Sequence, residues 1–533
     1  MFGAGAMTNS IPEIRDTELM FVIGSNTTEA HPVIAMEMKR AARAGARLIV
    51  ADPRRIWLAE IADLHLQLKP GTDVALLTAM AHVIIREGLH DEAFIAEHCE
   101  GFERVVEAVA ECTPEWASGI TSVPAADIET AARWYATTDR AGIYYTLGVT
   151  EHTHGTDNVY GLANLVLMTG HLGKRSCGLN PLRGQNNVQG ANDAGASPVF
   201  YPGYQRVSDA AAREKLEAAW GVSLPSGAGL NLNVMMKKLG TEIHGLYVIG
   251  EDVVVSEPNA GRIEEGLNAL EFLVVQDIFL NETARFADVI LPAACFAEKE
   301  GVFTNSDRRV QRVRKAVEPP GEARPDWQIL CELSTTVGYP MSYSHPREIY
   351  AEMASLAPKF AGISHERIEA EGGLQWPCEA PDQPGTPTLH GDGPIRGRGL
   401  FQAIAYRPSA ELPDAEYDLL LSTGRTLYHY NSATQTRRGA GSMAKQPSNF
   451  VEMNKRDARK RGLSDGEEVR VTSRRGEVTA RVLYSPRMRP GCVWMPLHFP
   501  EENTNRLTND AGDAVTQTAE YKVCAVRVEP VAS

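Results

Sequence analysis

The chain has 533 residues, of which 43% are hydrophobic and 23% are charged, and its formal net charge is −15. This length exceeds what a single hydrophobic core supports, so we expect about three or four domains. The acidic balance argues against nucleic acid as a partner, because phosphate groups are bound by basic surfaces. No apolar run in the sequence approaches the length that spans a bilayer, so we expect no membrane span.

Eight cysteines are scattered along the sequence, and no two of them stand at CxxC spacing. The sequence therefore carries no iron–sulfur or zinc signature of its own. The cysteines are also too sparse for a disulfide scaffold. We expect buried, reduced thiols in a cytoplasmic protein.

Short apolar strands alternate with helical patterns in the first part of the chain. The run LMFVIG ends at Gly24, and a polar segment and a helical pattern from Val33 follow it. Such alternation is typical of a parallel, doubly wound α/β sheet. The other elements that we expect in this unit are strands at 47–51, 64–68 and 142–147 and helices at 74–87 and 159–172.

The same pattern returns about 225 residues later in the sequence. LYVIG, at 246–250, resembles LMFVIG, and LVVQDIFLNETARFADVILPA, from 273, resembles LIVADPRRIWLAEIADLHLQL, from 48. In this alignment Asp52 corresponds to Asp277 and Asp63 to Asp288, each at a separation of 225 (277 − 52). Two alanine pairs share the frame, at 59 and 284 and at 62 and 287. We infer two related nucleotide-binding-type units in one chain.

The last part of the chain has a different pattern. Residues 372–398 are rich in proline and glycine, which indicates an excursion or linker. The runs YDLLLSTG, EEVRVTSRRGEVTARVLY and GCVWMPLHF then predict strands of a small barrel. The fold class that we predict is α/β, with two related doubly wound parallel-sheet units and a C-terminal β-barrel domain. The predicted boundaries are 1–184 for the first unit, 185–297 for the second, 298–398 for a connecting segment and 399–533 for the barrel.

Glycines and aspartates stand where the strands of both units end. Ligands of open parallel sheets bind beyond the carboxyl ends of the strands. Gly24 and Gly250 would let the backbone approach a phosphate, and Asp52 and Asp277 would accept hydrogen bonds from a ribose hydroxyl or a base edge. Each residue alone is explained as readily by a turn or a helix cap. The duplication favours a ligand with two nucleotide arms.

The densest polar segment is NPLRGQNNVQGAND, residues 180–193, which has neither helical nor strand periodicity. We expect a surface loop between the two units, where a cleft would form. Arg183 is its only cation, and a guanidinium matches a carboxylate as a planar fork, although a structural ion pair is the commoner role of a lone arginine. His152 and His154 form an HxH pair, which without a third ligand is more typical of a solvated or satisfied loop than of a metal site.

Residues 166–195, VLMTGHLGKRSCGLNPLRGQNNVQGANDAG, closely resemble the formate dehydrogenase branch of the molybdopterin oxidoreductases. The resemblance covers essentially the whole chain in order. Within it, RGQNNVQG separates the formate branch from the related periplasmic nitrate reductases, which carry a TGQ-type sequence there. The other segments that resemble this branch are GAMTNSI, FVIGSNTTEAHP, ADPRR, LKPGTD, VIGED, VVQDIF, EKEGVFTNSDRRVQ, PDWQI and EYKVCAVRVEP.

The resemblance implies a bis(molybdopterin guanine dinucleotide) cofactor with molybdenum or tungsten, in agreement with the duplicated units. It implies that one guanine arm is bound by Asn26, Glu29, Asp52, Arg54, Gly71 and Asp73, and the other by Gly250, Asp252, Ser256, Gln276, Asp277 and Asp326. It further implies that Gly148, Val149 and Gln185 approach the pterins and that Arg425, His429, Tyr430, Asn505 and Tyr521 close over the cofactor.

The activity that the resemblance implies is oxidation of formate to carbon dioxide. Arg183 would hold the carboxylate while hydride, a proton and two electrons, moves to the metal centre. An electron-transfer subunit of the iron–sulfur or flavin/NAD type is implied as a partner. Another molybdenum oxidoreductase, such as a nitrate reductase, and a non-catalytic cofactor-binding paralogue are the alternatives.

One departure from the family concerns the start of the chain. Family members carry a cysteine or selenocysteine that ligates the metal, followed by a histidine and preceded by a [4Fe-4S] cluster, all upstream of the GAMTNS-like segment. This chain starts at that segment. We therefore expect an N-terminally truncated catalytic (alpha) subunit that lacks the metal ligand, with a remnant of the N-terminal domain in 298–398. An in-frame UGA codon upstream of Met1 would explain such a start.

Overall fold

The computed structural model describes residues 1–531 and divides into two compact units. Unit 1 comprises Met1–Leu182, Val253–Glu265 and Thr388–Ser533, and unit 2 comprises Arg183–Asp252 and Gly266–Pro387. Unit 1 contains the first α/β sheet and the barrel, and unit 2 contains the second parallel sheet. Parallel sheets and a closed C-terminal barrel confirm the predicted fold class.

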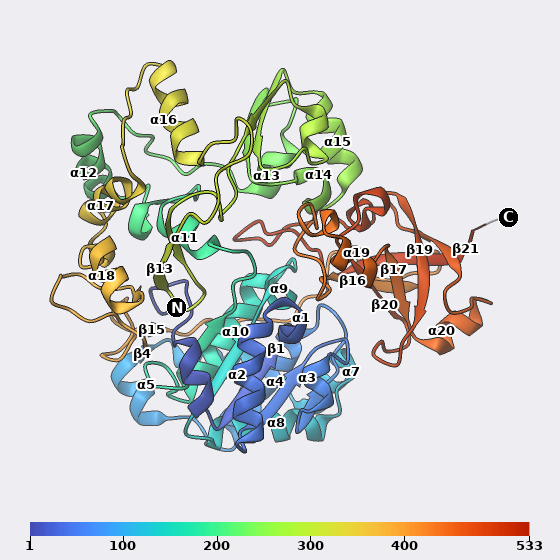
Figure 1. Cartoon of the computed structure of the whole chain (residues 1–533). Helices are drawn as coiled ribbons and strands as arrows, with labels where there is room; N and C mark the ends of the chain where they lie inside the picture. Colours follow the sequence, from blue (N-terminus) through green and yellow to red (C-terminus); the bar gives the residue numbers. More distant parts are fainter. Residues whose placement is uncertain (532–533) are drawn as a thin grey trace. The chain divides into compact units, whose positions relative to one another are not determined.

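The first sheet is five-stranded and parallel, in the order β3-β2-β1-β5-β6. Side chains of successive strand residues point to opposite faces. Phe21 and Ile49 therefore pack with helices α4, α8 and α10, whereas Val22 and Val50 pack with α2 (Figure 1). Helices on both faces explain why these strands read as continuous apolar runs. The elements are β1 (Leu19–Ile23), α2 (Pro32–Arg43), β2 (Arg47–Ala51), β3 (Leu64–Leu66), α4 (Asp73–Arg86), α8 (Ala125–Thr137), β5 (Ala141–Tyr145), α10 (Gly155–Met168) and β6 (Leu179–Pro181).

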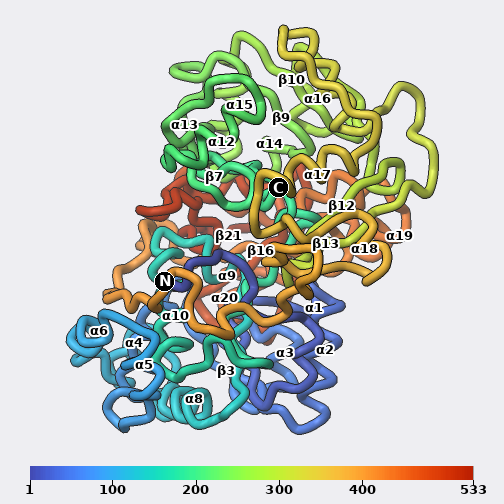
Figure 2. Tube along the Cα trace, turned by 90° about the vertical axis from the view of Figure 1, so that its left-hand side faces the viewer, coloured from blue at the N-terminus to red at the C-terminus, as the bar shows by residue number. Residues whose placement is uncertain are grey.

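Helix α4 lies at the centre of the helical layer on one face of this sheet. It packs against α8, α10 and α7 (Pro114–Thr121), and these helices lie together in Figure 2 as well. The predicted helix at 74–87 therefore differs from α4 by one residue at each end. The predicted helix at 159–172 is α10, which begins four residues earlier and ends four residues earlier.

The second sheet has three parallel strands in the order β11-β10-β9. Ile49 faces Leu64 in the first sheet, and Val274 faces Val289 in the second, so the strand register repeats at a separation of 225. Leu48 N donates to Asp63 Oδ2 over 2.8 Å. The equivalent bond, from Leu273 N to Asp288 Oδ2, measures 2.7 Å. The duplication inferred from the sequence is therefore present in the backbone. The strands are β9 (Gly245–Ile249), β10 (Phe272–Asp277) and β11 (Val289–Pro292).

The rest of unit 2 consists of short helices and a small antiparallel sheet, β12-β13-β14. The polar segment at 180–193 is not the surface loop that its composition predicts. It begins in β6 and ends in helix α11 (Val188–Asp193), and Gln189 and Asp193 on that helix are each only 1% exposed. The elements around it are α12 (Ala210–Trp220), α13 (Leu232–Lys237), β12 (Gly301–Thr304), β13 (Arg309–Val313), α16 (Asp326–Thr336), α17 (Pro346–Leu356), α18 (His365–Glu371) and β14 (Leu374–Gln375).

The C-terminal part of unit 1 is a closed barrel in the order β16-β20-β17-β19-β18-β21. Its strands follow the period-2 rule: Val478, Ala480 and Val482 of β19 are buried, and the residues between them are exposed. The strands are β16 (Leu419–Gly424), β17 (Phe450–Met453), β18 (Glu468–Thr472), β19 (Glu477–Tyr484), β20 (Cys492–Pro496) and β21 (Cys524–Pro530).

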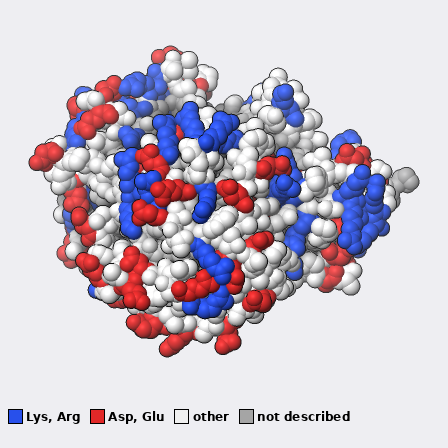
Figure 3. Space-filling view, turned by 90° about the horizontal axis from the view of Figure 1, so that it is seen from below, with Lys and Arg blue, Asp and Glu red and all other residues white. Residues whose placement is uncertain are grey.

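The surface and the cysteines agree with ordinary globular packing. Basic and acidic side chains are interspersed over much of the face drawn in Figure 3. All eight cysteines are free, and six of them are buried. Within residues 1–531, no helix combines the length and the apolar character needed to cross a bilayer.

Candidate functional site

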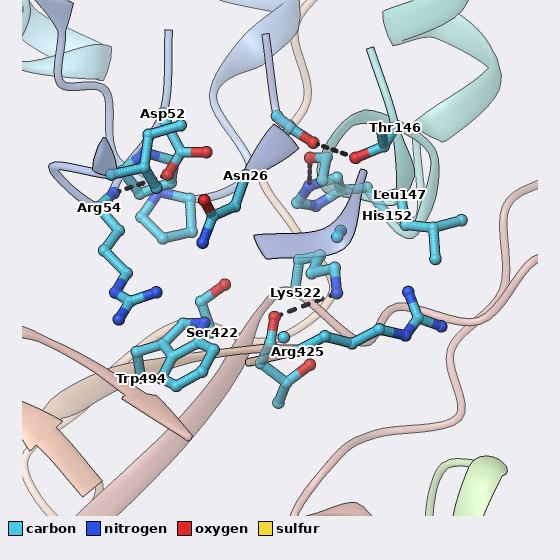
Figure 4. Close-up of a pocket in the computed structure, with 18 of the residues that line it drawn as sticks. Asn26, Asp52, Arg54, Thr146, Leu147, His152, Ser422, Arg425, Trp494 and Lys522 are labelled. Carbon is cyan, nitrogen blue, oxygen red and sulfur yellow. Dashed lines mark hydrogen bonds between the residues drawn. The ribbon is translucent and has the colours of Figure 1, made fainter. Parts of the chain in front are cut away.

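A pocket lies in unit 1 where β1, β2 and β5 end and where the first turns after β16 begin (Figure 4). Its position at the carboxyl ends of parallel strands is the one expected of a ligand site in this kind of sheet. The barrel contributes the opposite wall. The residues that line the pocket are Gly24, Asn26, Ala30, Asp52, Pro53, Arg54, Ile56, Pro70, Gly71, Asp73, Thr146, Leu147, Gly148, His152, Ser422, Thr423, Gly424, Arg425, Met488, Trp494 and Lys522.

Two glycines bring the loops after β1 and β5 into direct contact. Gly148 N donates to Gly24 O at 3.1 Å, and Thr146 Oγ1 donates to the same oxygen at 2.7 Å. A Cβ on Gly24 would lie 2.7 Å from the carbonyl carbon of Gly148, and a Cβ on Gly148 would lie 2.5 Å from Gly24 O. Only glycine allows this approach, so the loops form a backbone cradle at one end of the pocket.

Asp52 is the carboxylate of the pocket, and it is weakly compensated. Its Oδ1 accepts a hydrogen bond from Arg54 N at 2.9 Å. Burial raises the pKa of Asp52 to about 7, and the hydrogen bond from Arg54 N and the Arg54 charge only partly offset this effect. A carboxylate in this state gains from a ligand that donates hydrogen bonds to it.

The Arg54 guanidinium is directed away from Asp52 and toward the barrel. Its Nη2 pairs with Glu452 Oε2 at 2.7 Å, and its Cζ lies 4.3 Å from the centre of the Trp494 ring. A weaker contact of 3.9 Å joins Nη1 to Glu29. Arg54 is buried, yet its Nε has no hydrogen-bond partner among the residues that the structure describes. A buried unpaired donor is costly, so this atom fits a site that a ligand acceptor completes.

His152 lies at the floor of the pocket, beside acidic groups. Its Nε2 is 3.0 Å from Gly148 O, and its Nδ1 is 3.7 Å from Glu520 Oε1. Burial by itself would lower the pKa of His152, but Glu520 and Asp73 outweigh it and raise this pKa. The neighbouring His154 stacks on His152 at 5.6 Å, and burial together with the His152 charge lowers its pKa to about 4. The HxH pair is therefore buried rather than solvated.

Lys522 supplies the cation that faces the two strand ends. Its Nζ lies 2.9 Å from Glu151 Oε2 and donates to Thr423 O at 3.1 Å. Sequence reasoning missed Lys522 and Trp494 and set His152 aside. Lys522 and Trp494 carry no local signal, because their place in the pocket depends on how the barrel packs against the sheet within unit 1.

The pocket brings together seven of the residues that the resemblance implies for cofactor binding: Asn26, Asp52, Arg54, Gly71, Asp73, Gly148 and Arg425. Val149 is buried beside them, and its carbonyl accepts from Asn158 Nδ2 at 2.8 Å.

Four of the barrel-side residues that the resemblance implies do not line the pocket. His429 is buried, with Nε2 2.8 Å from Gln446 O, and Tyr430 is 42% exposed. Tyr521 O accepts from Thr423 Oγ1 at 2.7 Å. Asn505 is buried and donates through Nδ2 to Ser256 O at 3.0 Å, so it lies next to another implied residue.

The strand ends of unit 2 gather the residues implied for the second arm. Asp277 accepts hydrogen bonds from Ile278 N at 2.6 Å and from Asn281 Nδ2 at 2.9 Å. Burial raises the pKa of Asp277, and these donors act in the opposite direction. Asp252 accepts from Thr283 Oγ1 at 2.8 Å, which fixes the turn after β10.

Gln276 and Asp326 form a second pair in the same region. Gln276 Nε2 donates to Asp326 Oδ1 at 2.7 Å, and Lys299 Nζ forms an ion pair with the same carboxylate. Tyr247 hydrogen-bonds through its hydroxyl to Gln276. Gly250 has a φ of +67°, in the region that favours glycine. The structure therefore brings four of the six residues implied for this arm, Gly250, Gln276, Asp277 and Asp326, to the end of β10 and its neighbours.

Arg183 and Gln185 also belong to unit 2. Arg183 N donates to Ser306 Oγ at 3.1 Å, and its side-chain Nε donates to Gln189 Oε1 at 3.2 Å. Gln185 is half-buried in the turn before α11, and its carbonyl accepts from Val188 N. The contact that the Arg183 side chain makes with Gln189 is with a neutral amide rather than with a carboxylate.

These groups suit a nucleotide better than a bare metal ion. Backbone amides, a glycine cradle, a carboxylate and cations can bind diphosphate and base groups. Among residues 1–531, no cluster of three or more His, Cys, Asp or Glu side chains is arranged to hold a metal ion.

Comparisons with known proteins follow the same lines. The family model described as molybdopterin oxidoreductase matches residues 2–336, and the molydopterin dinucleotide binding domain matches residues 419–525. F420-dependent formate dehydrogenase 2 subunit alpha of Methanococcus maripaludis is 46% identical over 99% of this chain and 79% of its own length. Formate dehydrogenase H of Escherichia coli is 42% identical over 99% of this chain and 75% of its own length. Acetylene hydratase from Pelobacter acetylenicus shares the fold, with a TM-score of 0.75 and 19% identity over 98% of this chain and 81% of that chain.

Proposed function

The chain belongs to the molybdopterin oxidoreductase family, and on this premise we propose that it is the catalytic subunit of a formate dehydrogenase, which oxidises formate to carbon dioxide. The observation that carries the proposal is the match to formate dehydrogenase alpha subunits over 99% of the chain at 46% identity. Arg183, within RGQNNVQG, supplies the cation that such a reaction needs for its anionic substrate.

The proposed cofactor is bis(molybdopterin guanine dinucleotide) with molybdenum or tungsten. The first guanine arm would be held in unit 1 by Asn26, Asp52, Arg54 and the cradle of Gly24 and Gly148. Two features of that pocket fit such a ligand: the unpaired Nε of Arg54 and the Asp52 carboxyl with its raised pKa. A guanine edge donates hydrogen bonds that a carboxylate accepts, and a diphosphate accepts hydrogen bonds from backbone amides.

The second arm would be held in unit 2 by Gly250, Asp252, Gln276, Asp277 and Asp326, together with Ser256. Support for this assignment comes from the repeat, because the two units share strand register and strand-end aspartates. Gln185 and Val149 would approach the pterins, and Glu29, Gly71 and Asp73 would complete the first site. Arg425, His429, Tyr430, Asn505 and Tyr521 would contribute from the barrel side.

In the proposed mechanism the protein binds and orients formate. Arg183 would hold the carboxylate by charge-assisted hydrogen bonds and so fix the direction of the C–H bond. The metal–pterin group, when bound, supplies the acceptor for the proton and two electrons that leave the formate carbon as carbon dioxide forms. An electron-transfer subunit of the iron–sulfur or flavin/NAD type would carry the electrons away.

The proposal is tested by assaying the holoenzyme for formate oxidation and for nitrate reduction with artificial electron carriers. We expect formate oxidation alone. Arg183→Ala should lower formate turnover by roughly thirty- to a thousand-fold, because a lost charge-assisted bidentate contact costs about 2–4 kcal/mol. Arg183→Lys should recover only part, since an ammonium lacks the planar fork.

Arg314→Ala is the matched control, because Arg314 is an exposed arginine of unit 2 that pairs with Glu369. This variant should keep wild-type turnover. Nitrate reduction without formate oxidation would replace the proposal by another molybdenum oxidoreductase. Neither activity in a metal-replete preparation would favour a non-catalytic cofactor-binding paralogue.

A further inference from the structure

Helix α11 carries a buried polar network directly after Arg183. Gln189 and Asp193 stand four residues apart on this helix, so their side chains lie on the same face. Each of them is only 1% exposed. The network has the form of a chain of hydrogen bonds that begins at Asp193 and ends at the guanidinium of Arg183.

Asp193 is the fixed end of this chain. Its Oδ1 accepts hydrogen bonds from Gln189 Nε2 and from the Tyr204 hydroxyl, each at 2.9 Å. Its Oδ2 accepts from Trp376 Nε1, also at 2.9 Å. An ionised carboxylate accepts hydrogen bonds and donates none. Three donors from three separate segments of the chain therefore converge on one acceptor.

This arrangement determines which way the Gln189 amide faces. Nε2 has two hydrogens, and its two acceptors are Asp193 Oδ1 at 2.9 Å and the Tyr204 hydroxyl at 2.6 Å. The Tyr204 hydroxyl can accept from Gln189 because its own hydrogen is donated to Asp193. With the amino end fixed in this way, Oε1 must point to the opposite side.

The opposite side of the amide faces Arg183. Gln189 Oε1 accepts from Arg183 Nε at 3.2 Å, and Ser306 Oγ accepts from Arg183 N at 3.1 Å. Backbone and side chain of Arg183 are thus held at separate points. The bond through Nε uses neither Nη1 nor Nη2, the pair of nitrogens that can bind the two oxygens of a carboxylate end-on.

We propose that Asp193 and Gln189 are positioning residues for formate: Asp193 sets the orientation of the Gln189 amide, and Gln189 holds the Arg183 guanidinium in the direction that binds the substrate carboxylate. This inference rests on the proposed function, and it assigns a role to two residues that do not touch substrate themselves. A positioned guanidinium loses less freedom when it binds, and the gain appears as tighter formate binding.

Burial of the carboxylate agrees with a positioning role. A buried carboxylate held by neutral donors contributes little to stability, since the cost of removing it from water is large. Burial raises the pKa of Asp193, while the hydrogen bonds from Gln189, Tyr204 and Trp376 favour its ionised form. The three donors keep the acceptor that the Gln189 orientation requires.

The test is a double-mutant cycle on the holoenzyme, with formate affinity as the readout. Isothermal titration of formate into the dithionite-reduced enzyme measures binding without turnover. Gln189→Leu keeps the size of the side chain and removes both hydrogen bonds of the amide. We expect it to weaken formate binding roughly 10- to 100-fold, the effect of losing a hydrogen bond to a charged group. In steady-state assays formate KM should rise more than kcat falls.

The decisive comparison is Gln189→Leu in an Arg183→Ala background. If Gln189 acts through Arg183, the double variant should bind formate as weakly as Arg183→Ala alone. Additive losses would overturn the proposal, because they would mean that Gln189 acts independently of Arg183. Formate affinity within about twofold of wild type in the Gln189→Leu single variant would also overturn it.

Two further variants address Asp193 itself. Asp193→Asn would present an amino group to one of its three donors, so the Gln189 amide should lose its fixed orientation and formate binding should weaken as in Gln189→Leu. Tyr204→Phe removes one acceptor of Gln189 Nε2 and should give a smaller loss in the same direction, even if Asp193→Asn does not fold. Tyr201→Phe is the matched control, because its hydroxyl donates to Pro225 O and should leave formate affinity unchanged.

The result also distinguishes this inference from the proposed function. Unchanged formate binding in Arg183→Ala would remove Arg183 from the substrate site and would overturn both. Weakened binding in Arg183→Ala with wild-type binding in Gln189→Leu would overturn the positioning role alone. Acid-released nucleotide per chain should stay at the wild-type value in all of these variants, which excludes an effect through cofactor loss.

Discussion

The two parallel-sheet units share a backbone plan but differ in how they use it. Gly24 N donates to Ala51 O at 3.0 Å, and Gly250 N donates to Gln276 O at 2.9 Å, so the strand-end turns are equivalent. Both glycines have positive φ, +53° and +67°. The residue type is therefore the same at matched positions, while its surroundings are not.

The difference at the glycine is one of space. A Cβ on Gly24 would lie 2.7 Å from the carbonyl carbon of Gly148, which is backbone and cannot rotate away. A Cβ on Gly250 would meet no heavy atom of residues 1–531 within 4 Å. Gly24 is thus required by close packing as well as by its backbone conformation, and Gly250 by conformation alone.

The difference at the aspartate is one of compensation. Asp52 accepts one backbone hydrogen bond, from Arg54 N, and burial raises its pKa to about 7. Asp277 accepts hydrogen bonds from Ile278 N, Phe279 N and Asn281 Nδ2, which oppose the rise that burial causes in its pKa. A repeat that conserves strand register can therefore still give its two carboxylates different acidities.

The largest effect that we expect comes from alanine at the two glycines. Gly24→Ala should cost about 2–5 kcal/mol, because the strain of a left-handed alanine adds to an overlap that the backbone cannot relieve. Gly250→Ala should cost about 1–2 kcal/mol, from conformation alone. Amide hydrogen exchange in β1 and β9 measures the two losses separately. Equal losses would mean that the approach of Gly24 to Gly148 is not a constraint.

The second prediction concerns nucleotide content. Asp52→Asn and Asp277→Asn should each lower acid-released GMP from about two per chain to about one, because each neutral amide lacks the second acceptor that a guanine edge uses. The double variant should release little GMP. Asp382→Asn, an exposed acid of unit 2, is the control and should keep the wild-type content. Loss of both nucleotides in either single variant would contradict independent sites.

The third prediction is a difference in pH dependence. Asp52 has a pKa raised to about 7, so below this pH the carboxyl of the empty site is protonated and no longer accepts both hydrogen bonds of the base. Nucleotide affinity at the first site should then fall about tenfold per pH unit below 7. The second site should keep its nucleotide to lower pH, since more donors stabilise ionised Asp277.

GMP released during dialysis at stepped pH measures this difference. In wild type one nucleotide should leave before the other as pH falls. Asp52→Asn should remove the early step, because its amide does not titrate in this range. A single step at one pH for both nucleotides would show that the two carboxylates are equally compensated.

Periodicity and repeat spacing were sufficient to predict the two sheets. LMFVIG and RLIVA form β1 and β2, and the frame of 225 residues found in the letters is also the frame of the hydrogen bonds at Asp63 and Asp288. Strand ends are readable because a short apolar run and the glycine or aspartate that ends it are neighbours in the sequence. The site residues that follow directly from strand ends, such as Asp52, were therefore within reach.

Residues whose place depends on distant partners could not be predicted. The segment at 180–193 is polar and aperiodic, yet α11 is buried there because Trp376, 183 residues later, donates to Asp193. His152 is buried opposite Glu520, which stands 368 residues away. Lys522 lines the pocket only because the barrel packs on the sheet within unit 1. Local pattern carries no information on such pairs, since the partner is fixed by tertiary packing.

The smallest effect tests how far the equivalence of the two units extends. Asp63 and Asp288 are both exposed, and each carboxylate accepts one backbone hydrogen bond, from Leu48 N and Leu273 N. Asp63→Ala and Asp288→Ala should each cost about 0.5–1.5 kcal/mol, the net worth of one such bond, with the same loss of hydrogen-exchange protection at the two leucine amides. Glu60→Ala, in the same turn as Asp63, is the control and should change neither amide. A loss at one leucine much larger than at the other would mean that the units agree in register but not in energy, because the bond itself is the same length in both.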